Sequence, residues 1–251
     1  MKEMDVTRIL SLLGRSLPIT FAEKTVSTND DLRAAAKAGA PDYTVRIAGM
    51  QTGGRGREGR SFFSEGGLYL SILLPARADT LPLLTHIAAI AVARAIRKSA
   101  GANALIKWVN DVYVEERKVS GILTENIAVG TSRRVIMGIG VNVNVKAEMF
   151  PPELRESAGA VFANKTELAA AILRELFDLL DNFSPERVKR EYRELCFLPG
   201  RRVDVITEEG SRQAVVLGLT EELGLLVRYE DGQTGELIAG EVRLRLRNAA
   251  R

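Results

Sequence analysis

The chain has 251 residues, of which 46% are hydrophobic and 27% are charged, as in an ordinary globular protein. A chain of this length can bury a substantial core without disulfides or a structural metal. Its only cysteine and only histidine, Cys196 and His86, exclude an internal disulfide and argue against zinc-finger sites and His-dependent triads. A net charge of +3 suits nucleic-acid binding and nucleotide-using enzymes equally. The chemistry must therefore rest on Lys, Arg, Asn, Asp and backbone groups.

No signal peptide or membrane span is expected. Charged residues such as Asp5 and Arg8 interrupt the N-terminal region, which has no apolar segment of the signal-peptide kind. The most apolar stretch, 87–93, is followed by Arg94 and falls far short of the roughly 20 residues that a bilayer span requires. We expect a cytoplasmic protein without a membrane partner.

The hydrophobic pattern predicts alternating helices and strands up to about residue 197. A polar N-cap at 27–30 precedes an alanine-rich helix that stops at Gly39-Ala40-Pro41. The predicted elements are helix 31–38, strands 43–48 and 68–74, helix 83–98, strands 105–109, 112–114, 119–124 and 135–145, and helices 165–182 and 186–197. His86 and Cys196 fall in two of these helices, where we expect structural roles for both.

The pattern changes after Leu198-Pro199-Gly200. Short strands separated by Gly-bearing turns are predicted at 203–206, 214–219, 225–229, 235–238 and 242–246. Five strands in so short a segment favour a small SH3-like β-barrel. We therefore predict an α+β chain with a first domain at 1–197 and an SH3-like domain at 198–251.

An unusual loop lies at 53–60, where GGRGREGR places four glycines and three arginines in eight residues. Glycines let backbone N–H groups come close to an anion, and arginines supply planar bidentate donors for carboxylate and phosphate oxygens. This combination suits a site where a carboxylate attacks an α-phosphate and pyrophosphate leaves.

The loop has three competing interpretations. A solvated basic loop stays open on composition alone. An RGG-like RNA-binding segment is disfavoured, because there is a single copy without a disordered flank. A P-loop is excluded, because Arg60 stands where the phosphate-reaching lysine should be and Phe62-Phe63-Ser64 does not open a helix.

Four further segments accompany the loop and Gln51. They are STN at 27–29, KWVND at 107–111, KVSGILTE at 118–125 and GIGVNVN at 138–144. In order and spacing, the set resembles the motifs of the biotin–protein ligases, namely STN, QxxGRGRxGR, KWPND, KxxGIL and GIGxNVN. The match covers about residues 24 to 145, and the predicted C-terminal barrel fits the small final domain of that family.

The resemblance implies a mixed-sheet catalytic domain of the biotin/lipoate ligase type and a two-step reaction. Biotin's carboxylate attacks the α-phosphate of Mg²⁺-bound ATP to give biotinyl-5′-AMP, and a lysine of a biotin carboxyl carrier protein then takes the biotinyl group. The implied catalytic residues are Lys107 and Arg55. A lid formed by the loop would protect the mixed anhydride from water.

The resemblance also implies the binding residues. Biotin would contact Ser27, Thr28, Asn29, Gln51, Gly54, Arg55, Gly56, Arg57, Lys107 and Gly121. ATP would contact Arg57, Arg60, Phe62, Lys107, Asn110, Lys118 and Asn142, with Phe62 stacking on adenine. Mg²⁺ would be held mainly through ATP, and Asp111 would orient either Lys107 or a water on the magnesium.

The residues themselves leave simpler interpretations open. A strand lysine such as Lys107 is more often a snorkelling edge residue, and Asn110 could serve only as a turn. Gly121, Gly138 and Gly140 would let a ligand approach the backbone, or are ordinary sheet glycines. Val109 replaces the proline of the family motif, which restores a backbone N–H there.

Only about 25 residues precede the STN segment, so we expect a ligase without a winged-helix repressor domain and without a specific DNA partner. The resemblance also implies a homodimer, and an exposed strand of the catalytic sheet could pair either with a carrier strand or with a second copy of this chain. The rival functions are a lipoate or octanoate ligase on the same fold and a nucleic-acid-binding regulator.

Overall fold

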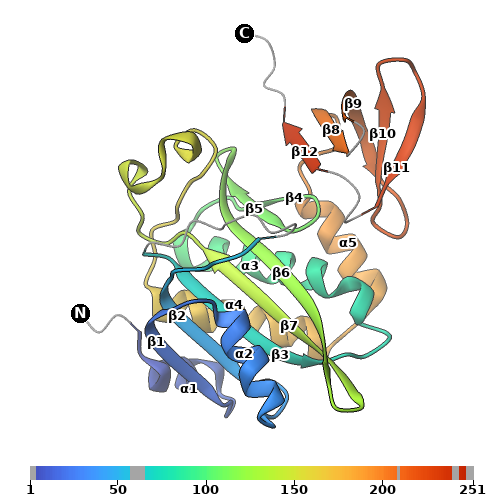
Figure 1. Cartoon of the computed structure of the whole chain (residues 1–251). Coiled ribbons are helices and arrows are strands. Elements are labelled where there is room, and N and C mark those ends of the chain that lie inside the picture. The colour runs from blue at the N-terminus through green and yellow to red at the C-terminus, as the bar shows by residue number, and fades with distance from the viewer. Residues whose placement is uncertain (1–3, 57–65, 208–209, 239–242, 247–251) are drawn as a thin grey trace.

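The structure is a computed structural model that describes residues 4–56, 66–207, 210–238 and 243–246 (Figure 1). Its helices are α1 (Val6–Leu13), α2 (Thr28–Lys37), α3 (Leu84–Ala100), α4 (Lys165–Asp181) and α5 (Pro185–Leu195), with 3₁₀ turns η2 (Leu81–Leu83), η3 (Ala147–Met149) and η4 (Pro152–Leu154). Its strands are β1 (Ile19–Thr25), β2 (Val45–Gln51), β3 (Leu68–Pro75), β4 (Leu105–Lys107), β5 (Asp111–Val114), β6 (Arg117–Val129), β7 (Ser132–Val141), β8 (Arg202–Thr207), β9 (Gly210–Leu219), β10 (Leu225–Tyr229), β11 (Thr234–Leu237) and β12 (Arg243–Leu246).

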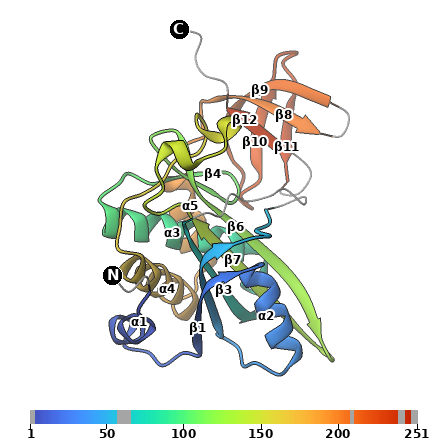
Figure 2. The ribbon, with the colours of Figure 1, turned by 60° about the vertical axis from the view of Figure 1, so that its left-hand side comes forward.

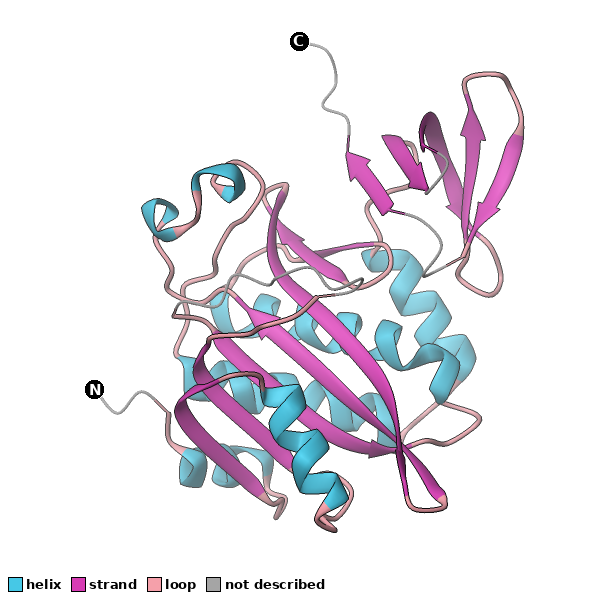
Figure 3. Cartoon of the chain, in the orientation of Figure 1, coloured by secondary structure: helices cyan, strands magenta, loops and turns pink. Residues whose placement is uncertain are grey.

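The first seven strands form one mixed sheet in the order β1-β2-β3-β7-β6-β5-β4 (Figure 3). β1 and β2 are parallel, and the other neighbours pair antiparallel. The mixed sheet confirms the predicted α+β class.

Helices cover the two faces of this sheet unequally (Figures 1 and 2). On one face α3 packs against β4 to β7, α4 packs against α3 and β3, and α1 and α5 complete the layer. On the other face α2 packs against β2, β3, β6 and β7. The inner strand β3 therefore lies between two helical layers, and its residues Leu68–Leu74 are all buried, as expected for a strand covered on both sides.

The short helix α2 is attached to the sheet by a small apolar cluster. Leu32 and Ala36 of the helix pack on Leu73 of β3 and Ile136 of β7. Residues 27–30 were predicted to precede the helix, but α2 begins at Thr28, with Ser27 in an extended conformation at its N-cap. This difference places the side chains of the STN segment in the first turn of the helix, against the sheet.

The C-terminal strands form a separate antiparallel sheet in the order β11-β10-β9-β8-β12, which confirms the predicted small β-domain. Its turn 220–223 makes hydrogen bonds with the preceding part of the chain. The Trp108 indole N–H donates to the Leu223 carbonyl at 2.8 Å, and Arg193 donates to the carbonyls of Thr220 and Glu221 at 2.8 and 2.9 Å. The boundary at residue 197 stays a prediction.

Sequence reasoning missed α1 and β1 and shortened the β6–β7 hairpin. α1 is amphipathic and capped, since Asp5 accepts from the Arg8 N–H and Gly14 ends the helix with φ +61°. β6 and β7 continue to a tight turn at Gly130, where φ is +59°. The polar and apolar residues of β1 alternate only weakly, because this strand lies partly exposed at an edge of the sheet.

The single cysteine and the single histidine both have structural surroundings, as predicted. Burial raises the pKa of the Cys196 thiol to about 11, so the thiol is not a reactive thiolate near neutral pH. His86 lies in α3 with its ring edge-on to Tyr192 at 4.7 Å between centroids. Burial lowers the pKa of His86 from 6.5 to about 4, so the folded protein holds this imidazole neutral.

The buried His86 predicts a specific loss of stability in mild acid. Because the unfolded chain binds a proton below pH 6.5 and the folded chain does not, the free energy of unfolding is highest above pH 6.5 and falls towards pH 4. Between pH 7.5 and pH 5 we expect a loss of about 2 kcal/mol, measured by urea unfolding. His86→Leu should remove most of this dependence. Equal pH dependence in the two proteins would exclude His86 as its source.

Among the described residues, no helix combines the length and the apolar character needed to cross a membrane.

Candidate functional site

One row of residues crosses the α2 face of the larger sheet, strand by strand. Residues paired across antiparallel strands point to the same face, and each pair in this row shares a residue with the next. From β4 to β2 the row consists of Lys107, Asp111, Gly121, Gly140, Tyr69 and Ala48. Charged residues therefore occupy one end of the row. Two adjacent glycines in its middle leave the backbone without side chains, which suits the close approach of a ligand.

The first turn of α2 lies over the next row of the sheet. Asn29 sits on Gly138, where a Cβ atom would come within 2.3 Å of the Asn29 Oδ1. The Ser71 hydroxyl of β3 lies 2.6 Å from the Asn29 Oδ1 and 2.7 Å from the Thr28 Oγ1. The sequence leaves open why residue 138 is glycine, and this close contact with Asn29 explains it. The helix can come this close to the sheet only because residue 138 has no side chain.

Gln51, at the end of β2, is bound to the same helix turn. Its Oε1 accepts from the Thr28 backbone N–H at 2.8 Å and from the Thr28 hydroxyl at 3.0 Å. A backbone N–H can only donate, so the carboxamide oxygen of Gln51 faces Thr28 and its NH₂ group is directed elsewhere. Gln51 therefore has an oriented pair of donors.

An ion-pair network extends from the sheet to the glycine/arginine loop. Asn29 donates from Nδ2 to Glu125 at 2.6 Å, and Arg33 donates to the other oxygen of Glu125 at 2.7 Å. Arg33 also binds Asp30 at 2.6 Å, and the guanidinium of Arg55 pairs with the same Asp30 oxygen. Arg55, predicted as catalytic, thus contacts the first turn of α2.

Two lysines and a carboxylate occupy the β4 end of the row. Lys118 Nζ lies 2.6 Å from Asp111 Oδ1, and Lys107 Nζ lies 5.6 Å from the centroid of the Tyr113 ring. Burial raises the pKa of Tyr113 above its ordinary value, with Asp111 adding to the effect, so this phenol is neutral. Two ammonium groups and one carboxylate leave a positive excess, which favours an anionic ligand.

The KWVND segment that carries Lys107 is held by later parts of the chain. Trp108 binds the turn 220–223, as described above, and the peptide bond from Trp108 to Val109 is cis. The fully buried Tyr192 of α5 donates its hydroxyl proton to the Val109 carbonyl at 3.0 Å. Tertiary contacts therefore fix the backbone that directly follows Lys107.

Two predicted ATP-binding asparagines have different surroundings. The Asn110 side chain donates from Nδ2 to the Ile122 carbonyl at 2.8 Å, and the Asn110 backbone carbonyl accepts from the Ile122 N–H at 3.0 Å. Asn110 therefore connects the start of β5 to β6. Asn142 is buried and donates to the Gly159 carbonyl at 2.9 Å. Its Oδ1 has no hydrogen-bond partner within the part of the chain that the structure describes. A buried acceptor of this kind is costly unless a ligand or water satisfies it.

Most of the described candidates lie in two groups on the same face of the larger sheet. One group surrounds the first turn of α2 and consists of Ser27, Thr28, Asn29, Gln51 and Arg55. The other group consists of Lys107, Asp111 and Gly121 of the sheet row, with Lys118 paired to Asp111. Arg57, Arg60 and Phe62 lie outside the described residues.

Four contributing residues were not predicted: Ser71, Asp30, Arg33 and Glu125. Glu125 ends the KVSGILTE segment and Asp30 follows STN, so their positions beside the motifs were a usable signal. Ser71 and Arg33 carry no such signal, because only strand register and the helix position bring them to the site.

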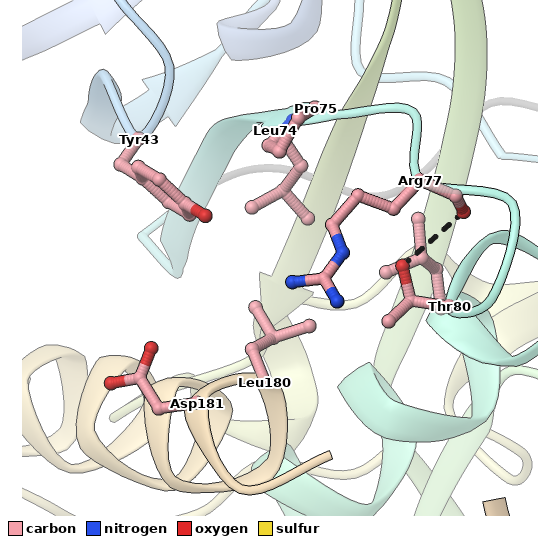
Figure 4. Close-up of a pocket in the computed structure, with 8 residues that line it drawn as sticks. Tyr43, Leu74, Pro75, Arg77, Thr80, Leu180 and Asp181 are labelled. Carbon is pink, nitrogen blue, oxygen red and sulfur yellow. Dashed lines mark hydrogen bonds between the residues drawn. The ribbon is translucent and has the colours of Figure 1, made fainter. Parts of the chain in front are cut away.

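A cavity of about 240 Å³ lies apart from these residues, between the ends of β3 and α4 (Figure 4). Tyr43, Arg77 and Leu180 are among the residues that line it. Arg77 is exposed and paired with Asp79, and none of the predicted site residues lines this cavity. It gives no indication of the chain's chemistry.

Comparison with known proteins identifies the class to which this fold and site belong. Residues 21–142 match the biotin/lipoate A/B protein ligase family. The chain is also 32% identical to the bifunctional ligase/repressor BirA of Bacillus spizizenii, over 85% of this chain and 70% of that protein. The chain therefore belongs to the biotin/lipoate A/B protein ligase family.

Two further proteins are similar to this chain over most of their own length. The biotin–[acetyl-CoA-carboxylase] ligase of Mycobacterium tuberculosis is 29% identical over 87% of this chain and 86% of its own length. The structure of the biotin protein ligase from Aquifex aeolicus in complex with biotin and ATP superimposes with a TM-score of 0.75, at 29% identity, covering 91% of this chain and 99% of that one.

Proposed function

We propose that this chain is an ATP-dependent biotin–protein ligase that forms biotinyl-5′-AMP and transfers the biotinyl group to a carrier-protein lysine. One arrangement carries the proposal: an oriented polar helix turn and a lysine-rich sheet end lie on the same face, with two glycines between them. A substrate with a polar head at one end and a reacting carboxylate at the other fits such a face. The similarity to biotin ligases supports this assignment.

The helix turn and Gln51 are proposed to bind the ureido head of biotin. Ser27 and Thr28 are each about 4% exposed, and Gln51 has donors directed away from Thr28. A ligand that leaves one of these buried polar groups without a hydrogen bond binds less favourably by about 1–3 kcal/mol. A ureido group supplies both donors and acceptors to such a site, whereas the dithiolane ring of lipoate supplies none. Asn29, whose amide is engaged by Glu125 and Ser71, acts mainly in shaping the pocket.

Lys107 and Arg55 are proposed to act on the reacting carboxylate and the α-phosphate. Negative charge accumulates as the carboxylate oxygen attacks phosphorus and pyrophosphate leaves. Fixed cations at this point stabilise the transition state more than the ground state. Asp111, paired with Lys118 and opposite Lys107 in register, orients both ammonium groups.

Asn142, Asn110 and Lys118 are proposed to serve ATP. The Asn142 Oδ1 is a buried acceptor without a partner among the described residues, which suits the amino group of adenine. Asn110 shapes the β5–β6 connection beside the phosphates. Described residues contain no cluster of three or more potential metal-ligating His, Cys, Asp or Glu side chains. We propose that Mg²⁺ is held mainly by the ATP phosphates, and Asp111 is a carboxylate of the site that could orient a water on the ion.

The partner is proposed to be the apo carrier domain of a biotin-dependent carboxylase, which presents its lysine to the adenylate. We further propose homodimerisation through β1. This strand is one edge of the larger sheet and its outer side has no strand neighbour among the described residues, so a second copy can extend the sheet by strand pairing.

Exchange of labelled pyrophosphate into ATP tests the first half-reaction. The purified chain should catalyse exchange that depends on biotin and is not supported by lipoate or octanoate. Exchange with lipoate but not biotin would assign the chain to the other branch of the family. Exchange with none of these acids would contradict the proposed function.

Gln51→Leu tests the polar end of the pocket. The substitution keeps the size of the side chain but removes both oriented donors and the acceptor for Thr28. We expect the KM for biotin in the exchange reaction to rise about tenfold, equivalent to about 1.4 kcal/mol, with the KM for ATP unchanged. Gln213→Leu is the matched control, because Gln213 is exposed on β9. An unchanged KM for biotin in Gln51→Leu would remove Gln51 from the binding site.

A further inference from the structure

Glu125 lies in β6 on the α2 face of the sheet, in the row that follows the row of Gly138. It pairs in register with Ile136 of β7, and Ile136 packs under α2. Its side chain is only 26% exposed. The motif resemblance gave this carboxylate no role, and its two oxygens are both engaged by α2.

Each Glu125 oxygen has a different donor. Oε2 accepts from Asn29 Nδ2 at 2.6 Å, and Oε1 accepts from Arg33 at 2.7 Å. Both donors are nitrogens that cannot accept a hydrogen bond. The site at residue 125 therefore requires two acceptors, and a carboxylate is the side chain that supplies them.

The Asn29 carboxamide is thereby oriented at both ends. Its nitrogen faces Glu125 and its oxygen faces the Ser71 hydroxyl at 2.6 Å. Because Asn29 follows Thr28 in the same helix turn, its orientation sets the position of the Thr28 N–H and hydroxyl that bind Gln51. A displacement of Glu125 can therefore reach Gln51 through the Glu125–Asn29 hydrogen bond, the adjacent residue Thr28 and the hydrogen bonds from Thr28 to Gln51.

Arg33 connects the same carboxylate to the glycine/arginine loop. It lies between Glu125 and Asp30, at 2.7 and 2.6 Å, and Asp30 also binds Arg55. The charges alternate along Arg55, Asp30, Arg33 and Glu125, so the two inner groups, Asp30 and Arg33, each lie between two groups of opposite charge. Partly buried groups of this kind hold one another in place more firmly than exposed pairs do.

We propose that Glu125 is a positioning residue of the ligase site, which fixes the first turn of α2 through Asn29 and Arg33. Glu125 contacts neither substrate. It sets the geometry in which Thr28 and Gln51 meet the acid substrate. This inference rests on the proposed function.

Glu125→Gln is the informative substitution. It keeps the size of the side chain, but its carboxamide has one acceptor and one donor group, so an N–H must face either Asn29 or Arg33. We expect the KM for biotin in pyrophosphate exchange to rise about tenfold or more. The KM for ATP and the kcat at saturating biotin should change less than threefold, roughly 0.6 kcal/mol. Glu194→Gln, at an exposed position on α5, is the matched control and should behave as wild type.

The same measurements separate the possible failures. Absence of biotin-dependent exchange in the wild-type chain would contradict the proposed function itself. An active wild type with an unaltered KM for biotin in a folded Glu125→Gln protein would overturn the positioning role. A rise in both KM values together with a fall in kcat would also overturn the positioning role, because that pattern indicates general damage to the protein.

Arg33→Met provides a second variant in case Glu125→Gln does not fold. It removes the guanidinium between Asp30 and Glu125 but leaves the Asn29 contact in place. We expect a smaller rise in the KM for biotin, about threefold. In the double variant the two effects should not add, because both substitutions break one network. Full additivity, or no effect of Arg33→Met on the KM for biotin, would contradict the proposal.

Discussion

Replacing Lys107 by Gln is expected to lower kcat for biotinyl-adenylate formation by about a thousandfold, equivalent to about 4 kcal/mol of lost transition-state stabilisation. The reason is the position of Lys107 at the cationic end of the sheet row, where it lies opposite Asp111 in register. A neutral amide can still donate a hydrogen bond but cannot balance the charge that develops on the α-phosphate. Single-turnover formation of the adenylate, measured with the enzyme in excess over biotin, gives the rate.

Lys37→Gln is the control for this prediction. Lys37 is an exposed lysine in the last turn of α2, so its loss removes the same charge away from the site. It should leave the rate within twofold of wild type. A Lys107→Gln enzyme that retains a tenth of the wild-type rate would show that Lys107 is a snorkelling strand residue, the simpler interpretation that its sequence position leaves open.

Gly138→Ala is expected to have the second largest effect. A Cβ at this position would lie 2.3 Å from Asn29 Oδ1 and 2.9 Å from its Cγ, and the Asn29 amide is already bound to Glu125 and Ser71. The helix turn must move or the hydrogen bonds must break. We expect a loss of about 3 kcal/mol in the free energy of unfolding and about a hundredfold weaker binding of biotin, measured by denaturant titration and by isothermal calorimetry.

Gly218→Ala is the matched control. Gly218 lies in β9 of the small sheet, and a Cβ there would meet nothing within 4 Å. It should leave both the stability and the binding of biotin unchanged. If Gly138→Ala bound biotin as tightly as Gly218→Ala does, the close contact between α2 and the sheet would not be needed for the site.

Much of the fold was predictable because its elements are strongly patterned. The helix predicted at 83–98 corresponds to α3 at Leu84–Ala100, and the short C-terminal strands fall where their Gly-bearing turns place them. Local pattern says little about an edge strand such as β1, whose burial alternates irregularly. It also placed the start of α2 too late, because the polar residues 27–30 resemble a cap although Thr28–Asp30 belong to the helix.

The site was predictable only where its residues stand in motifs. Thr28, Gln51 and Lys107 were proposed in this way, and their roles in binding and catalysis stay predictions. Ser71 was not, because a serine in an apolar strand becomes informative only when register places it beneath Asn29. For Asn110 the structural role as a tie to Ile122 is clear, and its contact with ATP stays a prediction.

The central claim is that this chain joins biotin to a protein lysine. The most direct measurement is the intact mass of an apo carrier domain after incubation with the chain, ATP, Mg²⁺ and either biotin or lipoate. We expect one added biotinyl group, which is lost when the acceptor lysine of the carrier is replaced by arginine or when ATP is omitted. An unmodified carrier with biotin, or a carrier that gains lipoyl in its place, would contradict it.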